Sequence, residues 1–251
     1  MASKPISQHN TEISLNSASW SKKPVLQKIY TRFYQEIATA LGSPDGSGVL
    51  EIGSGIGAIK TVLPKCVTSD IFNNPWLDRV ENAYSISFAD GSLEGIVLFD
   101  VWHHLRYPGL ALKEFARVLK PGGRLVLFEP AMGLLGRLIY GLFHHEPLGF
   151  GQRIEWEPAT AANPILDYYA SQANCWRMFR THSDPISAYH FFETTQIRLL
   201  SALTYVASGG FSKPQLYLTA SYPMVAKLEM MLDKAPALFA TRMLVVLTKK
   251  A

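Results

Sequence analysis

Residues 49–57, VLEIGSGIG, combine the residue types that hold a nucleotide-like ligand. A short apolar run, typical of a buried strand, contains one acidic residue, Glu51. Three glycines follow at alternate positions, Gly53, Gly55 and Gly57. Glycine lets the backbone approach a ligand closely, and a helix that starts here would point its N–H groups at the same place. A turn that merely favours glycine accounts for less of this pattern than a binding loop does.

The glycine spacing leaves the ligand open. Gly53 and Gly55 with Ala58 also satisfy the looser dinucleotide fingerprint G-x-G-x-x-G/A. A dinucleotide and a different nucleoside cofactor are both compatible with this loop alone.

A second group of reactive side chains, His144, His145 and Glu146, stands in the stretch LFHHEP. Adjacent histidines rarely chelate one ion together, and no third ligand follows at a regular spacing. We expect no metal site here, and instead a polar end to a helix with a histidine facing the substrate.

Strands and helices alternate around the glycine loop. Residues 24–41 have helical apolar spacing, with Pro24 in the first turn and Gly42 just past the end. The loop precedes a short helix (AIKTVLP), and further strands are predicted in CVTSD, DRVE, EGIVLFDVW and RLVLFEP. This alternation predicts right-handed crossovers and a parallel, doubly wound α/β sheet.

The remaining parts of the chain are less regular. Residues 1–23 are predicted to be a flexible N-terminal arm, and residues 24–251 a single domain. In the second half, TTQIRLLSALTYVAS has helical spacing, PQLYLTA resembles a strand, and RMLVVLT is a final strand. About 60 residues separate the fifth strand from that helix, more than an ordinary loop, so we expect a helical cap insertion over residues 131–193.

Composition excludes several classes of function. The net charge of +4 is mild and its basic residues form no run, so we expect no nucleic-acid partner. Two cysteines fit a reducing compartment, and the polar start lacks the apolar core of a secretory signal, so a cytoplasmic location is expected.

Three segments resemble the class I S-adenosylmethionine (SAM)-dependent methyltransferases, in particular the small-molecule branch known as type 11. They are EIGSGIG, NAYSISFADGSLEGIVLFDVWHHL and EFARVLKPGGRLVLFEP, in the family's order and spacing between residues 49 and 130. The resemblance implies a Rossmann-like, mostly parallel sheet of seven strands in the order 3-2-1-4-5-7-6. It also implies SAM as the cofactor, with S-adenosylhomocysteine as its product.

The resemblance assigns the cofactor-binding residues. Glu51 would lie near the amino-acid portion of SAM, and the backbone of Gly53, Ser54, Gly55 and Gly57 would lie against the ligand. Asp70, at the end of the second strand, would accept hydrogen bonds from both ribose hydroxyls, because a carboxylate has two acceptor oxygens.

The assignment of three further residues leaves alternatives. Many relatives have Asp-Ala where this chain has Asn82-Ala83, so Asn82 either accepts from the adenine amino group or is a plain turn residue. Asp100 either contacts the methionine end of SAM or caps a loop. Trp76 either packs on the purine or anchors the core.

His103 and His104 follow the fourth strand at the mouth of the predicted pocket. His103 is the candidate general base, since imidazole titrates near neutral pH, but the same residues could merely cap the loop. His104, His144, His145 and Arg177 are the candidate substrate residues.

The start of the expected cap, MGLLGRLIYGLF, has one apolar helical face formed by Leu135, Leu138, Ile139, Leu142 and Phe143. We expect this face to pack on the domain. The alternative is a lid or membrane-surface helix that serves a lipid-linked acceptor.

The predicted function is therefore methyl transfer from SAM to an oxygen, nitrogen or carbon atom of a small molecule, such as a sugar or a lipid-linked precursor. An NAD(P)-dependent oxidoreductase and a non-catalytic SAM-binding protein are the alternatives. A short-chain dehydrogenase would require a Tyr-x-x-x-Lys dyad after the fourth strand, and the chain has none there.

Overall fold

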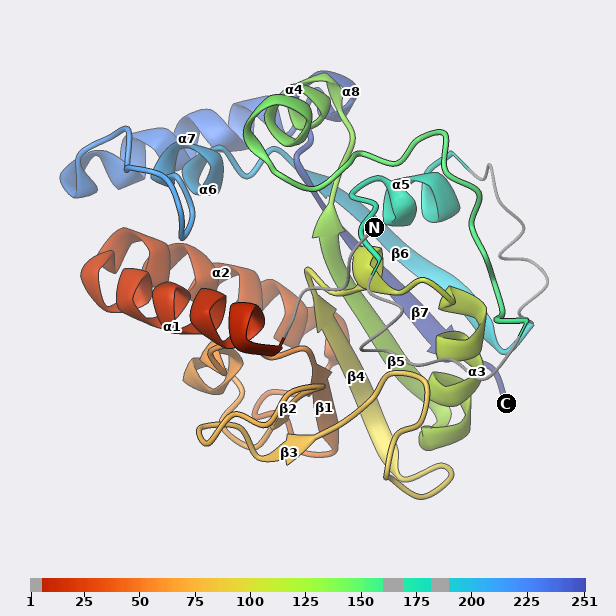
Figure 1. Ribbon diagram of the computed structural model, residues 1–251. Coiled ribbons are helices and arrows are strands. Elements are labelled where there is room, and N and C mark those ends of the chain that lie inside the picture. Colours follow the sequence, from red (N-terminus) through yellow and green to blue (C-terminus); the bar gives the residue numbers. More distant parts are fainter. Residues whose placement is uncertain (1–5, 160–168, 182–189) are drawn as a thin grey trace.

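A seven-stranded sheet organises the protein, seen in a computed structural model that describes residues 6–159, 169–181 and 190–251 (Figure 1). The strand order is β3-β2-β1-β4-β5-β7-β6, which confirms the predicted Rossmann-like order. Strands β1 to β5 run parallel, and β7 pairs antiparallel with both β5 and β6. The strands are β1 (Val49–Ile52), β2 (Val67–Asp70), β3 (Arg79–Val80), β4 (Leu93–Phe99), β5 (Leu119–Pro130), β6 (Phe192–Leu200) and β7 (Arg242–Lys249).

The central strands are apolar on both faces because helices cover both sides of the sheet. Successive side chains of β4 point to opposite faces, so Val97 joins one core and Ile96 and Leu98 join the other. Helix α2 (Pro24–Leu41) packs on the first face, and helix α3 (Pro108–Val118) packs on the second. The carboxyl ends of β1, β2, β4 and β5 consequently lie along one edge, where ligands bind in open α/β sheets.

The N-terminal stretch contains a helix, α1 (Ile6–Lys22), where we predicted a flexible arm. Ile13 is buried, and the Trp20 ring meets the Tyr30 ring of α2 edge-on with centroids 5.7 Å apart. Two apolar contacts thus tie a mostly polar helix to the domain.

The sixth strand lies in a different segment from the predicted one. Residues 192–200 form β6 rather than the start of a helix, and only Leu203–Ser208 is helical (α6). Thr195 and Ile197 are β-branched, and an edge strand with one solvent-facing side does not require strict apolar alternation. The stretch PQLYLTA contains no strand and ends in a short 3₁₀ helix, η4 (Thr219–Ser221).

The described residues between β5 and β6 contain two helices, α4 (Leu134–Phe143) and α5 (Asn174–Phe179). α5 is part of the main core, where Cys175, Met178 and Phe179 are almost fully buried. The predicted cap over residues 131–193 stays a prediction, because residues 160–168 and 182–189 lie outside the described residues.

The apolar face of α4 does not pack on the domain as we expected. Leu138, Leu142 and Phe143 are exposed, and Leu135 and Ile139 are half-buried. α4 lies beside α8 (Pro236–Phe239), with α7 (Tyr222–Leu232) further along the same end of the molecule (Figure 1).

Candidate active site

The glycine loop leaves β1 through three residues with positive φ, Gly53 (71°), Gly55 (52°) and Gly57 (70°). A Cβ on Gly53 would lie 2.4 Å from Val101 Cγ2, so Gly53 is required by the packing of the protein itself. A Cβ on Gly55 would meet nothing within 4 Å. Gly55 therefore borders open space, which a ligand could fill.

Two serines fix the path of the loop over the next strand. Ser54 N donates to Ser69 O (2.7 Å), and Ser69 N donates to Ser54 Oγ (3.0 Å). Ser69 Oγ in turn donates to Glu51 O (2.7 Å). Because these groups are buried, the loop is held rigidly before any ligand binds.

Asp70 lies where the sequence placed it, at the end of β2 and against the glycine loop. Its Oδ2 accepts from Gly55 N (3.3 Å) and its Oδ1 accepts from Phe72 N (3.4 Å). Trp76 lies over the same loop and donates from Nε1 to Gly55 O (2.9 Å). Since Trp76 is 47% exposed, it is not a core anchor.

Glu51 carries a buried carboxyl beside this loop. Burial, joined by the charge of Asp70, raises the pKa of Glu51 to about 7, and hydrogen bonds from Ser54 and Tyr34 only partly offset the rise. Glu51 Oε2 is buried and has no hydrogen-bond partner. Buried polar atoms are normally paired, so an orphaned carboxylate oxygen marks a place where a donor is missing.

Asn82 uses its side chain within its own turn. Its Oδ1 accepts from Tyr84 N (3.0 Å), and its backbone pairs with Ser85. Asn82 therefore has the role of a turn residue, which the sequence analysis gave as the alternative to a contact with adenine. Ala83 is buried in the core.

Asp100 forms an ion pair at the carboxyl edge of the sheet. Its carboxylate accepts from the guanidinium of Arg242, the first residue of β7, and Arg242 is buried over the Tyr205 ring. Asp100 adopts φ 57°, an unusual conformation for a residue other than glycine. Arg242 therefore holds Asp100 in place, and any contact of Asp100 with a ligand would be shared with this ion pair.

His103 is held between two carboxylates. Its Nδ1 lies 2.6 Å from Glu129 Oε2, and its Nε2 lies 3.6 Å from Glu146 Oε2. Burial alone lowers the pKa of His103, but the two carboxylates outweigh it and raise this pKa to about 10. A protonated imidazole has no lone pair, so this arrangement does not suit the predicted general base.

Glu129 was not identified as the partner of His103 in the sequence analysis. Its Oε1 accepts from Val101 N (2.8 Å) and Trp102 N (2.7 Å), which starts the 3₁₀ helix η2 (Trp102–His104). The available signal was a single acidic residue at the end of an apolar strand, the same signal that identified Glu51.

The three histidines that we predicted to contact the substrate lie around the carboxylate of Glu146. The nitrogens of His104, His144 and His145 lie 3.7, 3.8 and 3.9 Å from its carboxylate oxygens. A hydrogen bond from His103, together with His104 and His144, lowers the pKa of Glu146 despite its burial. Arg177 has a different role, because its guanidinium donates to Gly149 O (3.0 Å) and Gln152 O (2.7 Å) and ties α5 to the turn at residues 149–152.

In the described part of the chain, two groups of side chains have atoms that could bind a metal ion within 4.8 Å of one another. Both contain His103, the first with His104 and Glu146 and the second with Asp100 and Glu129. The raised pKa of His103 favours the protonated ring, which has no lone pair for a cation. The absence of a metal site stays a prediction.

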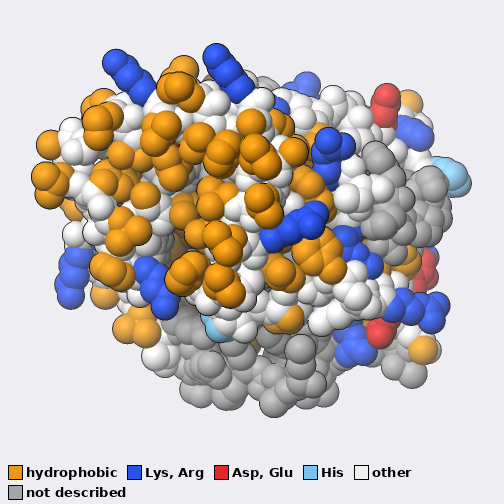
Figure 2. Space-filling model, turned by 90° about the horizontal axis from the view of Figure 1, so that it is seen from above, with side chains coloured by type: hydrophobic (Ala, Val, Ile, Leu, Met, Phe, Trp, Pro, Cys, Tyr) orange, Lys and Arg blue, Asp and Glu red, His pale blue; other side chains and the backbone are white. Residues whose placement is uncertain are grey.

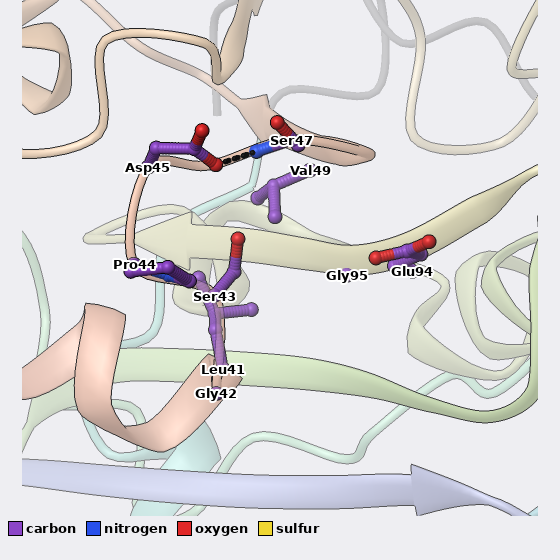
Figure 3. Close-up of a pocket in the computed structure, with 9 residues that line it drawn as sticks. All are labelled: Leu41, Gly42, Ser43, Pro44, Asp45, Ser47, Val49, Glu94 and Gly95. Atoms are coloured by element: carbon purple, nitrogen blue, oxygen red, sulfur yellow. Dashed lines mark hydrogen bonds between the residues drawn. The ribbon is translucent and has the colours of Figure 1, made fainter.

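A separate cavity of about 180 Å³ lies at the opposite edge of the sheet (Figure 3). It is lined by the end of α2 and by the starts of β1 and β4, including Leu41, Val49 and Gly95. Asp45 closes its rim by accepting from Ser47 N (3.0 Å). This cavity contains none of the predicted site residues.

Comparisons with known proteins bear on the fold and on the segment around the glycine loop. Residues 50–127 match a family model described as a methyltransferase domain. The geranyl diphosphate C-methyltransferase from Streptomyces coelicolor, solved with Mg²⁺, geranyl diphosphate and S-adenosylhomocysteine, is 12% identical with a TM-score of 0.51, covering 88% of this chain and 79% of that one. The cyclase SpnF is 17% identical with a TM-score of 0.50, covering 88% of this chain and 81% of that one.

At these identities the two structures are evidence for the fold alone, and one of them is described as a cyclase. The segment matched by the family model is the one that carries the glycine loop, Asp70 and the strand ending at Phe99. The matched segment resembles a methyltransferase domain, and the strand order is that of the Rossmann-like methyltransferase fold.

Proposed function

We propose that the protein binds SAM at the glycine loop and transfers its methyl group to an oxygen, nitrogen or carbon atom of a small molecule. The observation that carries the proposal is the convergence of three features at one place. Gly55 borders open space, Asp70 faces the same loop, and Glu51 has an orphaned buried oxygen beside it.

Each feature suits one part of SAM. The space beside Gly55 admits the ligand against the backbone. Asp70 would bind the ribose hydroxyls, and Glu51 would attract the ammonium of the amino-acid portion, which supplies the donor that Oε2 lacks. When bound, SAM supplies an activated methyl group on a sulfonium.

The residues around Glu146 would form the acceptor side. We propose that His103 acts as a fixed cation that orients Glu129 and Glu146, and not as a base. His104, His144 and His145 surround the same carboxylate and would face the acceptor. Because SAM has a good leaving group, alignment of the acceptor contributes much of the rate.

The NAD(P)-dependent alternative fits less well because of the element that follows the loop. A dinucleotide places its pyrophosphate at the N-terminus of a full helix, whose dipole stabilises the negative charge. Here the loop leads into η1 (Ala58–Thr61), a 3₁₀ helix of four residues. A single turn provides little of that dipole.

A matched pair of glycine variants tests the proposal. Gly55 and Gly91 both have positive φ (52° and 59°) and open space at the Cβ position. We expect Gly55→Val and Gly91→Val to lose similar stability from backbone strain, on the order of 1–2 kcal/mol. Only Gly55→Val should lose S-adenosylhomocysteine binding in calorimetry, because its side chain would occupy the cofactor's position.

Binding of S-adenosylhomocysteine that is equal in both variants would contradict this placement. Binding of NAD(P) but not S-adenosylhomocysteine by the wild type would favour the oxidoreductase. Binding of SAM without turnover on any acceptor would favour a non-catalytic SAM-binding protein.

A further inference from the structure

Three helices at one end of the molecule expose apolar side chains in regular rows. On α4, Leu134, Leu138 and Leu142 are spaced four residues apart and are 64%, 51% and 69% exposed. On α7, Met224, Leu228 and Met231 are spaced at one helical turn and are 69%, 47% and 66% exposed. We call these exposed faces of α4 and α7, together with Leu238 of α8, the apolar platform.

Unlike an ordinary surface helix, α7 exposes apolar residues and buries its acidic one. Its acidic residue, Glu229, points inward and is buried, where it accepts from Thr204 N and Thr204 Oγ1, both at 2.7 Å, and from Arg32. An amphipathic helix on a water-facing surface buries its apolar side and exposes its charges. Since α7 is fixed by buried polar contacts, its outward methionines and leucine are a fixed feature of the fold.

The helix α4 is held in the same way. Tyr140 is buried and donates from its hydroxyl to Thr241 O (2.9 Å). A Cβ on Gly136 would lie 2.7 Å from Ala240 O, so α4 lies directly against the residue that ends α8. The platform is therefore a continuous surface, and Figure 2 shows hydrophobic side chains gathered over this end of the molecule.

Basic side chains accompany the platform. Arg137 of α4, Lys227 of α7 and Lys234 just after α7 are exposed. In the part of this face that the structure describes, Figure 2 shows Lys and Arg side chains around the apolar area, and acidic side chains only toward one margin. An exposed apolar area with basic residues at its edge matches the interfacial zone of a bilayer that contains anionic lipids.

We propose that the apolar platform binds the surface of an anionic lipid bilayer. None of the helices in the described ranges is long and apolar enough to cross a membrane, so the contact would be interfacial. A second copy of the chain fits less well. In a two-fold contact the same face meets itself, which would bring two sets of like charges, each with Arg137, Lys227 and Lys234, into one interface.

The platform lies on the side of the molecule that holds the candidate site. α4 begins four residues after β5 ends and is followed by Glu146, which faces His103. Binding at the platform would therefore place the acceptor side of the site near the lipid surface. This docking does not depend on methyl transfer, so the two proposals can fail separately.

Vesicle co-sedimentation of the full chain tests the proposal, with phosphatidylcholine vesicles and with vesicles that also contain phosphatidylglycerol. We expect binding to the anionic vesicles and at least tenfold weaker binding for Leu138→Glu/Leu142→Glu, because two apolar contacts with the bilayer are replaced by charges. Leu15→Glu is the matched control, since Leu15 is a helical leucine that is 63% exposed outside the platform. It should bind vesicles as the wild type does.

A second variant tests the role of charge. Lys227→Gln/Lys234→Gln should weaken binding to the anionic vesicles by roughly tenfold or more and leave S-adenosylhomocysteine binding unchanged. Wild-type protein that binds neither kind of vesicle would overturn the proposal. So would a wild-type dimer in sedimentation velocity that Leu138→Glu/Leu142→Glu converts to a monomer, since the platform would then be a subunit interface.

Discussion

The buried carboxyl of Glu51 predicts a specific change of stability with pH. Its pKa of about 7 in the folded protein lies above its ordinary value of 4.5, because burial disfavours the charged form. Because the folded protein holds this proton more tightly than the unfolded chain, protonated Glu51 contributes fully to the free energy of unfolding below about pH 4.5. This contribution is lost as the pH rises through 7. Each unit of difference corresponds to about 1.4 kcal/mol, so the full effect is roughly 3 kcal/mol.

The substitution Glu51→Gln removes the titration and keeps the shape of the side chain. Between about pH 5 and about pH 8, the free energy of unfolding of the wild type should fall by roughly 2.5 kcal/mol relative to the variant. Urea denaturation of both proteins at the two pH values measures this difference directly. Other titrating groups are common to both proteins and cancel in the comparison.

The cofactor-free protein must be used, because a bound cationic ligand would itself favour the ionised carboxylate. Curves for the two proteins that run parallel across this pH range would refute the reasoning. Such a result would mean that Glu51 is solvated in the folded state, and its orphaned oxygen would then no longer mark a ligand site.

Three further predictions follow from the same site. If the ammonium of S-adenosylhomocysteine pairs with ionised Glu51, the affinity of the protein for this ligand should fall about fivefold from pH 7 to pH 6, and calorimetry should show proton release on binding. The Glu51→Gln variant should show neither effect. Asp70→Asn should weaken S-adenosylhomocysteine binding by roughly 10- to 100-fold because a charged acceptor is lost, whereas Asp90→Asn, at a carboxylate whose side chain is 79% exposed, should bind normally. His103 should give the ¹⁵N NMR signature of a doubly protonated ring at pH 8, since its pKa is raised to about 10 by Glu129 and Glu146; a neutral ring at that pH would restore it as a general base.

The central strands were predictable from local sequence patterns, whereas the strand order came from the family resemblance. β1, β4 and β5 are apolar runs bounded by glycine or proline, and the helix between β4 and β5 has clear periodicity. β6 was misassigned because leucines in residues 199–203 extend a helical spacing into an edge strand. What makes residues 192–200 a strand is antiparallel pairing with β7, a contact about 50 residues away in the chain that no local pattern encodes.

Contacts between distant parts of the chain also limited the prediction of the site. The positions of Glu51, Gly55 and Asp70 were predictable because strand ends of a parallel sheet must meet at one edge, and their role in cofactor binding stays a prediction. The pairs His103–Glu129 and Asp100–Arg242 were not predictable. Each joins residues that are far apart in the chain and meet only at the carboxyl edge of the folded sheet. The turn role of Asn82 depended on the position of Tyr84 N, which the sequence cannot fix.

The charges around the glycine loop also bear on the choice between the two cofactors. Glu51 and Asp70 place two carboxyls beside a loop that ends in a single turn of 3₁₀ helix. Bringing a pyrophosphate there would add negative charge next to Asp70 and raise the pKa of Glu51 further, so binding would take up a proton. A ligand with an ammonium and a sulfonium does the opposite and drives proton release. The direction of proton transfer on binding therefore discriminates between the two ligands independently of any catalytic assay, and it depends only on the two carboxyls that the fold fixes at this edge.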